Sequence, residues 1–147
     1  MQDDSLLLDA SLERAAETLG DITEPAMACF YETCPEAKAA FEHHGLGDRR
    51  KLEALMVENV VYALMNWLGR EEQLRIELRD SVPHHEETLK VPPGWYRALV
   101  EAVIEVIART VPADATAERA LLTRIGAELA EAIEGSAARF AKHATAA

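Results

Sequence analysis

Apolar residues recur along most of the chain at steps of three and four, the spacing that places side chains on one face of an α-helix. No stretch alternates apolar and polar residues as a half-buried strand does. Glycine and proline punctuate the pattern and divide it into six to eight helical stretches with short connections. The pattern therefore predicts an all-α fold in a single domain spanning residues 1–147.

Three helices are predicted in the first third of the chain. The first has an apolar stripe of four residues, Leu8, Leu12, Ala15 and Leu19. Gly20 ends it, and a second helix is expected from about residue 23 to residue 33. Pro35 breaks the second helix because the residue before a proline is pushed out of the helical region. A short helix over residues 35–41 then leads into the polar corner "EHHGLGD".

A long helix is predicted over residues 49–68, ending at Gly69. Its apolar face consists of Leu52, Met56, Val60, Leu64 and Trp67. The following stretch is less regular and contains Pro83, which inside a helix costs about 3 kcal/mol or more. We therefore expect Pro83 to open a new short helix at residues 81–83, with His84 and His85 in its first or second turn.

Two helices are predicted in the last third of the chain. The first follows the turn "VPPG" and runs to about residue 110, with an apolar face of Tyr96, Leu99, Val103 and Ile107. The second covers about residues 116–143, with an apolar face of Leu121, Ile125, Leu129 and Ile133.

The charge balance narrows the range of partners. With 26 acidic and 15 basic residues, the formal net charge of −11 repels phosphate backbones and anionic lipid, so we expect neither nucleic acid nor a membrane as a partner. The first residues are acidic where a secretory signal is basic, and no apolar run approaches the roughly 20 residues that span a bilayer. We expect a soluble, cytoplasmic protein, in which Cys29 and Cys34 are reduced packing residues.

Two motifs and the distance between them resemble the globin family. In "FYETCPEAKAAF", residues 30–41, a proline ends the second helix and a phenylalanine, Phe41, follows six residues later. In "HEETLKVPPGWYRAL", a histidine precedes a Val-Pro turn and an aromatic residue that begins the next helix. Counting 29 residues back from His85 reaches Met56, the distal position of animal globins, and Val60 lies one turn later.

The resemblance implies a globin-like fold of six to eight helices and a b-type haem, iron protoporphyrin IX. It assigns His85 as the proximal iron ligand, Phe41 as the ring that stacks on the haem, and Val91 as a residue of the haem corner. Trp95 or Tyr96 begins the seventh helix. The haem-binding residues implied in this way are Phe41, His43, Met56, Val60, His84, His85, Val91 and Tyr96.

The four histidines of the two His-His pairs have alternative roles. His84 competes with His85 for the iron, or it lies at the haem edge near a propionate. His43 and His44 follow Phe41 in a corner where globins place a cation near a propionate, and the alternatives are solvated loop residues or a distal iron ligand. Two exposed histidines in an acidic loop are the alternative for His84 and His85 together.

The predicted distal side lacks the usual hydrogen-bond donors. Met56 stands where globins often have histidine or glutamine, and Met27 lies near a position that is tyrosine in many bacterial globins. A thioether donates no hydrogen bond, so bound oxygen loses more stabilisation than carbon monoxide or nitric oxide. Asn59 is the nearest polar side chain, at the surface or turned inward. Met56 is either core filling or, alternatively, an axial ligand.

The resemblance implies reversible binding of a diatomic gas, oxygen, nitric oxide or carbon monoxide, in gas handling or sensing. One alternative is a haem enzyme with nitric oxide dioxygenase or peroxidase-like activity; without a Gly-rich dinucleotide motif in the chain, it would use a separate reductase. Another is a haem-free globin-like module that regulates a signalling protein. An unrelated helical bundle is the remaining alternative. The sequence does not distinguish transport from sensing or redox catalysis, and it does not determine the oligomeric state.

Overall fold

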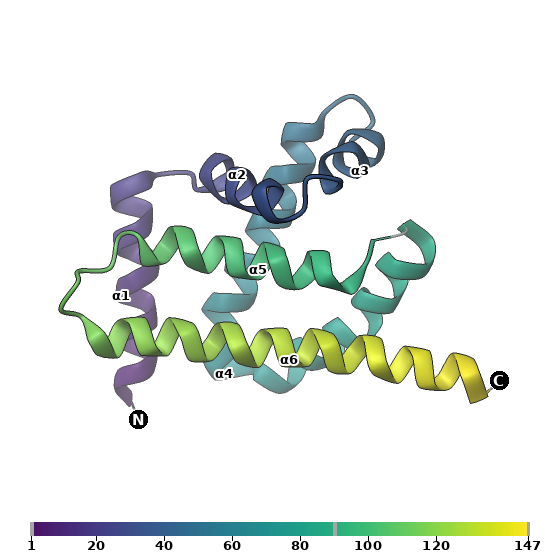
Figure 1. The fold of residues 1–147 in the computed structure, drawn as a ribbon. Coiled ribbons are helices and arrows are strands. Elements are labelled where there is room, and N and C mark those ends of the chain that lie inside the picture. Colours follow the sequence, from purple (N-terminus) through teal and green to yellow (C-terminus); the bar gives the residue numbers. More distant parts are fainter. Residues whose placement is uncertain (1, 90, 147) are drawn as a thin grey trace.

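The computed structural model is built of α-helices, as the apolar periodicity predicts (Figure 1). It describes the backbone of residues 2–89 and 91–146 and the side chains of residues 4–84 and 91–137. The helices of this part of the chain are α1 (Gln2–Leu19), α2 (Thr23–Thr33), α3 (Ala37–His44), α4 (Arg49–Leu89), α5 (Pro93–Ala108) and α6 (Thr116–Ala146). Within these ranges there are six helices and no strand, which confirms the all-α prediction.

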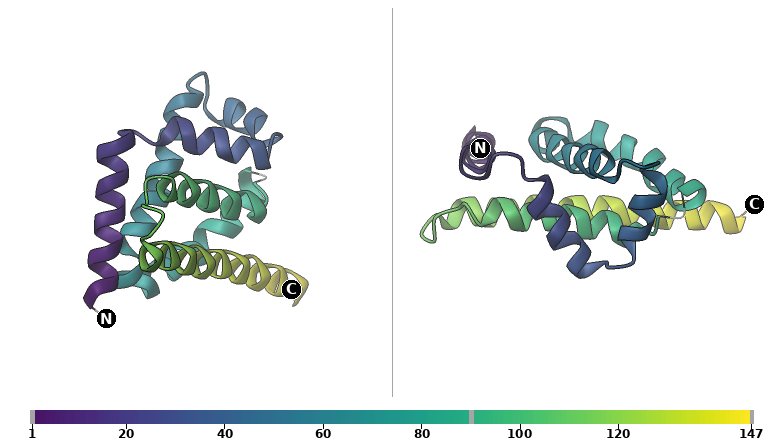
Figure 2. Two further views of the ribbon diagram at one scale, coloured as in Figure 1. Left: turned by 60° about the vertical axis from the view of Figure 1, so that its left-hand side comes forward. Right: turned by 90° about the horizontal axis from the view of Figure 1, so that it is seen from above.

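Helices α4, α5 and α6 form the centre of the molecule (Figures 1 and 2). Helices α5 and α6 lie side by side, with α4 packed against both. Helix α1 crosses the α5–α6 pair near one end, and α2 packs on α5. The predicted apolar stripe of α6 is buried in full, and Val103, Val106 and Ile107 of α5 are buried against it. The core therefore lies where these helices meet, because each contributes one apolar face.

Several predicted boundaries are confirmed. Gly20 follows α1 with a φ of +66°, a conformation that favours glycine. Helix α2 has the predicted bounds, and Cys34 leaves the helical region with φ −128° and ψ 71° before Pro35. Helix α5 begins at Pro93, in its first turn, where the missing N–H costs little. Cys34 is buried and Cys29 is half-buried, and both are free thiols.

The corner between α3 and α4 is shorter than predicted. Helix α3 extends to His44, so His43 and His44 lie in its last turn instead of in a loop. Gly45 then brings the chain close to the start of α4. A Cβ added at Gly45 would lie 2.7 Å from the carbonyl oxygen of Phe41 and 3.0 Å from the Cα of Arg49. The tight corner therefore depends on glycine at this position.

The prediction for residues 69–88 is confirmed at Gly69 and wrong at Pro83. The predicted end of the long helix at Gly69 is confirmed, because Arg70 directly after it has φ −136° and ψ 35° and interrupts the helical backbone; a second helical stretch then continues to Leu89, at an angle to the first. Pro83 lies inside this continuation and does not open a new helix. Burial of Leu74 and Val82 stabilises the segment by roughly 1.5–3 kcal/mol each, which offsets the cost of about 3 kcal/mol for an interior proline.

A buried polar cluster fixes α1 to the start of α6. The Glu118 carboxylate, 5% exposed, accepts a hydrogen bond of 2.5 Å from Ser11 Oγ and a second from Arg14. Burial raises the pKa of Glu118, but the hydrogen bonds from Arg14 and Ser11 and the Arg14 charge outweigh burial and lower the pKa. The carboxylate is therefore held in its ionised form at neutral pH.

Among the described residues, no helix combines the length and apolar character that crossing a membrane requires.

Candidate functional site

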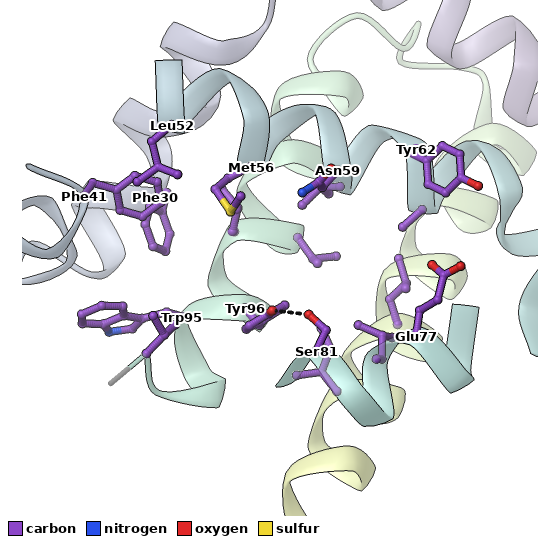
Figure 3. A pocket seen from close by; sticks show the side chains of 18 of the residues that line it. Phe30, Phe41, Leu52, Met56, Asn59, Tyr62, Glu77, Ser81, Trp95 and Tyr96 are labelled. Carbon is purple, nitrogen blue, oxygen red and sulfur yellow. Dashed lines mark hydrogen bonds between the residues drawn. The ribbon is translucent and has the colours of Figure 1, made fainter. Parts of the chain in front are cut away.

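A cavity of about 450 Å³ lies between the two halves of α4, residues 49–69 before the bend and residues 71–89 after it (Figure 3). Side chains of α2, α3, α5 and α6 complete it. Its described lining consists of Phe30, Ala40, Phe41, His44, Leu52, Met56, Asn59, Val60, Tyr62, Ala63, Leu74, Glu77, Leu78, Ser81, Val91, Trp95, Tyr96, Leu99, Val100, Leu129 and Ile133. Most of these side chains are aliphatic or aromatic, so the interior favours an apolar occupant.

The break at Arg70 creates the cavity from the two consecutive helical stretches of α4. Before the bend, Leu52, Met56 and Val60 recur every four residues and form one wall. After the bend, Leu74 and Leu78 recur at the same spacing and form the opposite wall. A straight helix would point these two stripes in similar directions, whereas the bend turns them toward each other.

Aromatic rings close one end of the cavity. Phe41 packs edge-to-face on Phe30, with 6.0 Å between the ring centroids and 66° between the planes. Its other neighbour is Tyr31, also at 6.0 Å and nearly perpendicular. Trp95 lies near Phe41 at the same end (Figure 3), and its indole N–H donates to Glu36 over 3.3 Å. This end presents flat apolar surfaces held by packing from several helices.

Two hydroxyl groups face each other inside the cavity. Ser81 Oγ of α4 and Tyr96 Oη of α5 are 2.7 Å apart (Figure 3). Burial raises the pKa of Tyr96, and the hydrogen bond with Ser81 opposes that effect only in part. The phenol is therefore neutral at physiological pH. The hydrogen bond joins the second half of α4 to α5. It also satisfies two hydroxyl groups that would cost free energy if they were buried without a partner.

The other end of the cavity is polar. Tyr62 and Glu77 lie there, away from Phe41 and Trp95 (Figure 3). Arg70 donates to Tyr62 Oη over 3.3 Å and to Gln73 Oε1 over 2.5 Å. Gln73 in turn donates to Glu77 Oε1 over 3.3 Å. The Arg70–Tyr62 bond thus reaches back across the bend, and the other two bonds continue from Arg70 along the second half of α4.

The cavity brings together most of the residues that the globin resemblance selects. Five of them line it: Phe41, Met56, Val60, Val91 and Tyr96. His43 and His84 are exposed and are not among the described lining residues, whereas His44 is. The side chain of His85 lies outside the described residues, so its assignment stays a prediction.

Two further predicted distal residues differ in position. Asn59 lines the cavity on the first wall, between Met56 and Val60, while part of its side chain remains exposed. Met27 is buried in the core and is not among the described lining residues. Asn59 is therefore the only carboxamide among the described lining residues.

The polar end and the second wall were missed from the sequence. Tyr62 and Glu77 join the cavity only because the bend at Arg70 brings residues 15 positions apart to one end. A local signal for the second wall does exist. Leu74, Leu78 and Ser81 follow one another at steps of four and three, a helical face that the expected break at Pro83 concealed.

Among the described lining residues, the side chains able to ligate a soft or borderline metal are the imidazole of His44 and the thioether of Met56. His44 belongs to the last turn of α3, where its ring packs on that of His43 with 5.0 Å between centroids. Met56 belongs to the first wall of the cavity.

Comparison of the chain with protein-family models, with curated proteins and with solved structures gives no match.

Proposed function

We propose that the chain is a haem-binding protein of globin type that reversibly binds a diatomic gas, in gas handling or sensing. The observation that supports this proposal most is the cavity between the two halves of α4. It collects Phe41, Met56, Val60, Val91 and Tyr96, which the resemblance selects from three separate stretches of sequence.

The residues present fit a haem. A volume of about 450 Å³ lies within the roughly 300–1,000 Å³ of small-molecule and cofactor pockets. The aliphatic lining limits access of water to an iron centre, and the rings of Phe41 and Trp95 offer flat faces to a porphyrin. When bound, ferrous haem supplies an iron coordination position at which a diatomic gas binds reversibly.

His85 is the proposed axial ligand. Position 85 follows Ser81 by four residues within α4, the spacing at which two helical positions share a face, and Ser81 lines the cavity. A neutral imidazole can bind iron through one ring nitrogen while the other nitrogen donates a hydrogen bond that fixes the ring. His84, one position away, belongs to a different face and is exposed.

The other residues have supporting roles in this proposal. Phe41 packs on the cofactor from the aromatic end, and Val60 and Val91 add apolar lining that keeps water from the cofactor. Met56 provides apolar volume and no hydrogen-bond donor. His44, at the cavity margin, is better placed than His43 to meet a carboxylate of the cofactor.

Haemin titration of the purified protein tests the proposal. We expect a Soret band that saturates at one haemin per chain. Ala63→Trp, which fills the cavity, should weaken binding at least tenfold, whereas Ala10→Trp on the exposed face of α1 should leave it unchanged. The proposal fails if no Soret band develops or if both variants bind haemin equally well.

Enzymatic use of the same cofactor is the second candidate, and the hydroxyl pair inside the cavity is the observation that favours it. Tyr96 and Ser81 are protic groups near the proposed cofactor position, and the raised pKa keeps the phenol protonated. Nitric oxide dioxygenase or peroxidase-like activity would then need a separate reductase as partner. Turnover of nitric oxide or peroxide far above that of free haemin, lost in Tyr96→Phe, would support this candidate over simple gas binding.

A further inference from the structure

The bend at Arg70 has the geometry of a hinge between the two walls of the cavity. Arg70 is the residue of α4 with non-helical backbone angles, φ −136° and ψ 35°. The wall before it includes Met56 and Val60, and the wall after it includes Leu74 and Leu78. A small change in the backbone angles at Arg70 therefore alters the separation of the walls more than it alters either wall.

Four side chains span this hinge on the cavity side, and we call Tyr62, Arg70, Gln73 and Glu77 the clasp. Arg70 donates to Tyr62 of the first wall and to Gln73, and Gln73 donates to Glu77 of the second wall. Tyr62 and Glu77 are themselves lining residues at the polar end of the cavity (Figure 3). The clasp therefore connects the two walls at the point where they part.

A different contact holds the base of the hinge. The guanidinium carbon of Arg75 lies 5.2 Å from the ring centroid of Trp67, a cation–π contact between the two halves of α4. Trp67 is 1% exposed, and its indole N–H donates to Glu128 of α6 over 2.7 Å. This contact is anchored in the core, whereas the four clasp residues are exposed. The hinge thus has a contact between Arg75 and the buried ring of Trp67 that stays in place, and exposed hydrogen bonds of the clasp that can break.

We propose that the clasp holds the polar end of the cavity closed and sets the rate at which the cavity's ligand is taken up and released. Hydrogen bonds between exposed side chains exchange readily with water, so the clasp can open without unfolding the core. The inference rests on the proposed function for the identity of the ligand, haem, but it requires no contact between the clasp and that ligand.

The rate of haemin loss to an excess of a haem-scavenging apoprotein tests the clasp. Arg70→Met removes both central hydrogen bonds and should speed haemin loss about fivefold, within the range expected for an exposed network. Tyr62→Phe removes the single bond to Arg70, and Gln73→Leu removes the bonds to Arg70 and Glu77 but leaves the Arg70–Tyr62 bond, so each should give a smaller increase. Arg79→Met makes the same substitution at an exposed arginine of the same half of α4, outside the clasp, and should leave the rate unchanged.

Amide hydrogen exchange supplies a second readout that does not depend on haem. Residues 74–82 should exchange faster in Arg70→Met than in Arg79→Met, while the thermal midpoints of the two variants stay equal. Equal rates of haemin loss in these two variants, or equal rates of amide exchange, would overturn the proposal that the clasp controls opening of the cavity. If Arg70→Met does not fold, Tyr62→Phe and Gln73→Leu decide the matter by the same comparisons. If the wild-type protein binds no haemin, the proposed function fails and hydrogen exchange alone decides whether the clasp exists.

Discussion

Ser81 and Tyr96 join the second half of α4 to α5 through hydroxyl oxygens 2.7 Å apart, inside a cavity whose other described walls are mainly apolar. Ser81 lies on the helical segment that carries the proposed iron ligand, and Tyr96 lies on α5. Because Pro83 has no N–H to donate within that segment, contacts to α5 become more important for its position.

We expect Tyr96→Phe and Ser81→Ala each to lower the free energy of unfolding by about 1 kcal/mol, the net value of one hydrogen bond between neutral groups. The double variant should lose less than the sum of the two single variants, because both single changes remove the same hydrogen bond. Chemical denaturation of the four proteins measures this coupling. Strict additivity would show that the two hydroxyls do not interact in solution.

The Glu118 cluster should make the protein sensitive to acid. A carboxyl whose pKa is lowered by folding stabilises the folded state fully above its unfolded pKa, near 4.3, and this stabilisation is lost as the pH falls through the lower folded pKa. Glu118→Gln should therefore lose about 2 kcal/mol at pH 7 and show a flatter decline in stability below pH 5. Thermal unfolding between pH 3 and pH 7 tests this. A parallel decline in both proteins would exclude Glu118 as a source of the acid sensitivity.

Gly45, just before α4, and Gly69, just before the bend at Arg70, should respond oppositely to alanine: one substitution should lower the free energy of unfolding and the other should raise it. At Gly45 a Cβ meets backbone atoms at 2.7 Å, so Gly45→Ala should destabilise the fold by about 1–3 kcal/mol. At Gly69, inside α4, a Cβ meets no atom of the described structure within 4 Å, so Gly69→Ala should stabilise by up to about 1 kcal/mol through helix propensity. Denaturation midpoints check both values. Destabilisation by Gly69→Ala would mean that the bend at Arg70 needs the freedom of glycine.

Under the proposed function, Asn59 should favour oxygen over carbon monoxide. Its amide is a hydrogen-bond donor on a wall where Met56 and Val60 offer none, and a donor stabilises the ligand that takes up partial negative charge. Asn59→Leu should weaken oxygen affinity about tenfold, equivalent to a bond of about 1.4 kcal/mol, with carbon monoxide affinity changed less than twofold. Equilibrium titration with each gas gives the ratio. An unchanged ratio would place the Asn59 amide outside the gas-binding region.

The sequence predicts boundaries of α1, α2 and α5 well because these boundaries depend on local chemistry. Gly20 ends α1 through its positive φ, Pro35 excludes the helical region at Cys34, and Pro93 is favourable in a first turn. Each of these effects acts within a few residues and can therefore be predicted from the sequence alone.

The bend at Arg70 and the helical course through Pro83 were not predictable in the same way. The direction that the chain takes after Gly69 depends on what Leu74 and Val82 bury, and their partners come from distant parts of the chain. The second wall of the cavity was therefore missed, and the polar end formed by Tyr62 and Glu77 with it. The first wall was found because its stripe repeats every four residues within one uninterrupted helix.

Absorption spectra of the haemin-loaded protein test most directly whether His85 binds haem iron. They are recorded for the ferric, ferrous and carbon monoxide-treated forms of the wild-type protein, His85→Ala and His84→Ala. If His85 binds the iron, His85→Ala loses or alters the Soret band in all three forms, while His84→Ala keeps the wild-type spectra. Unchanged spectra in His85→Ala would contradict the assignment of His85 as iron ligand, and absence of a Soret band in the wild-type protein would contradict haem binding itself.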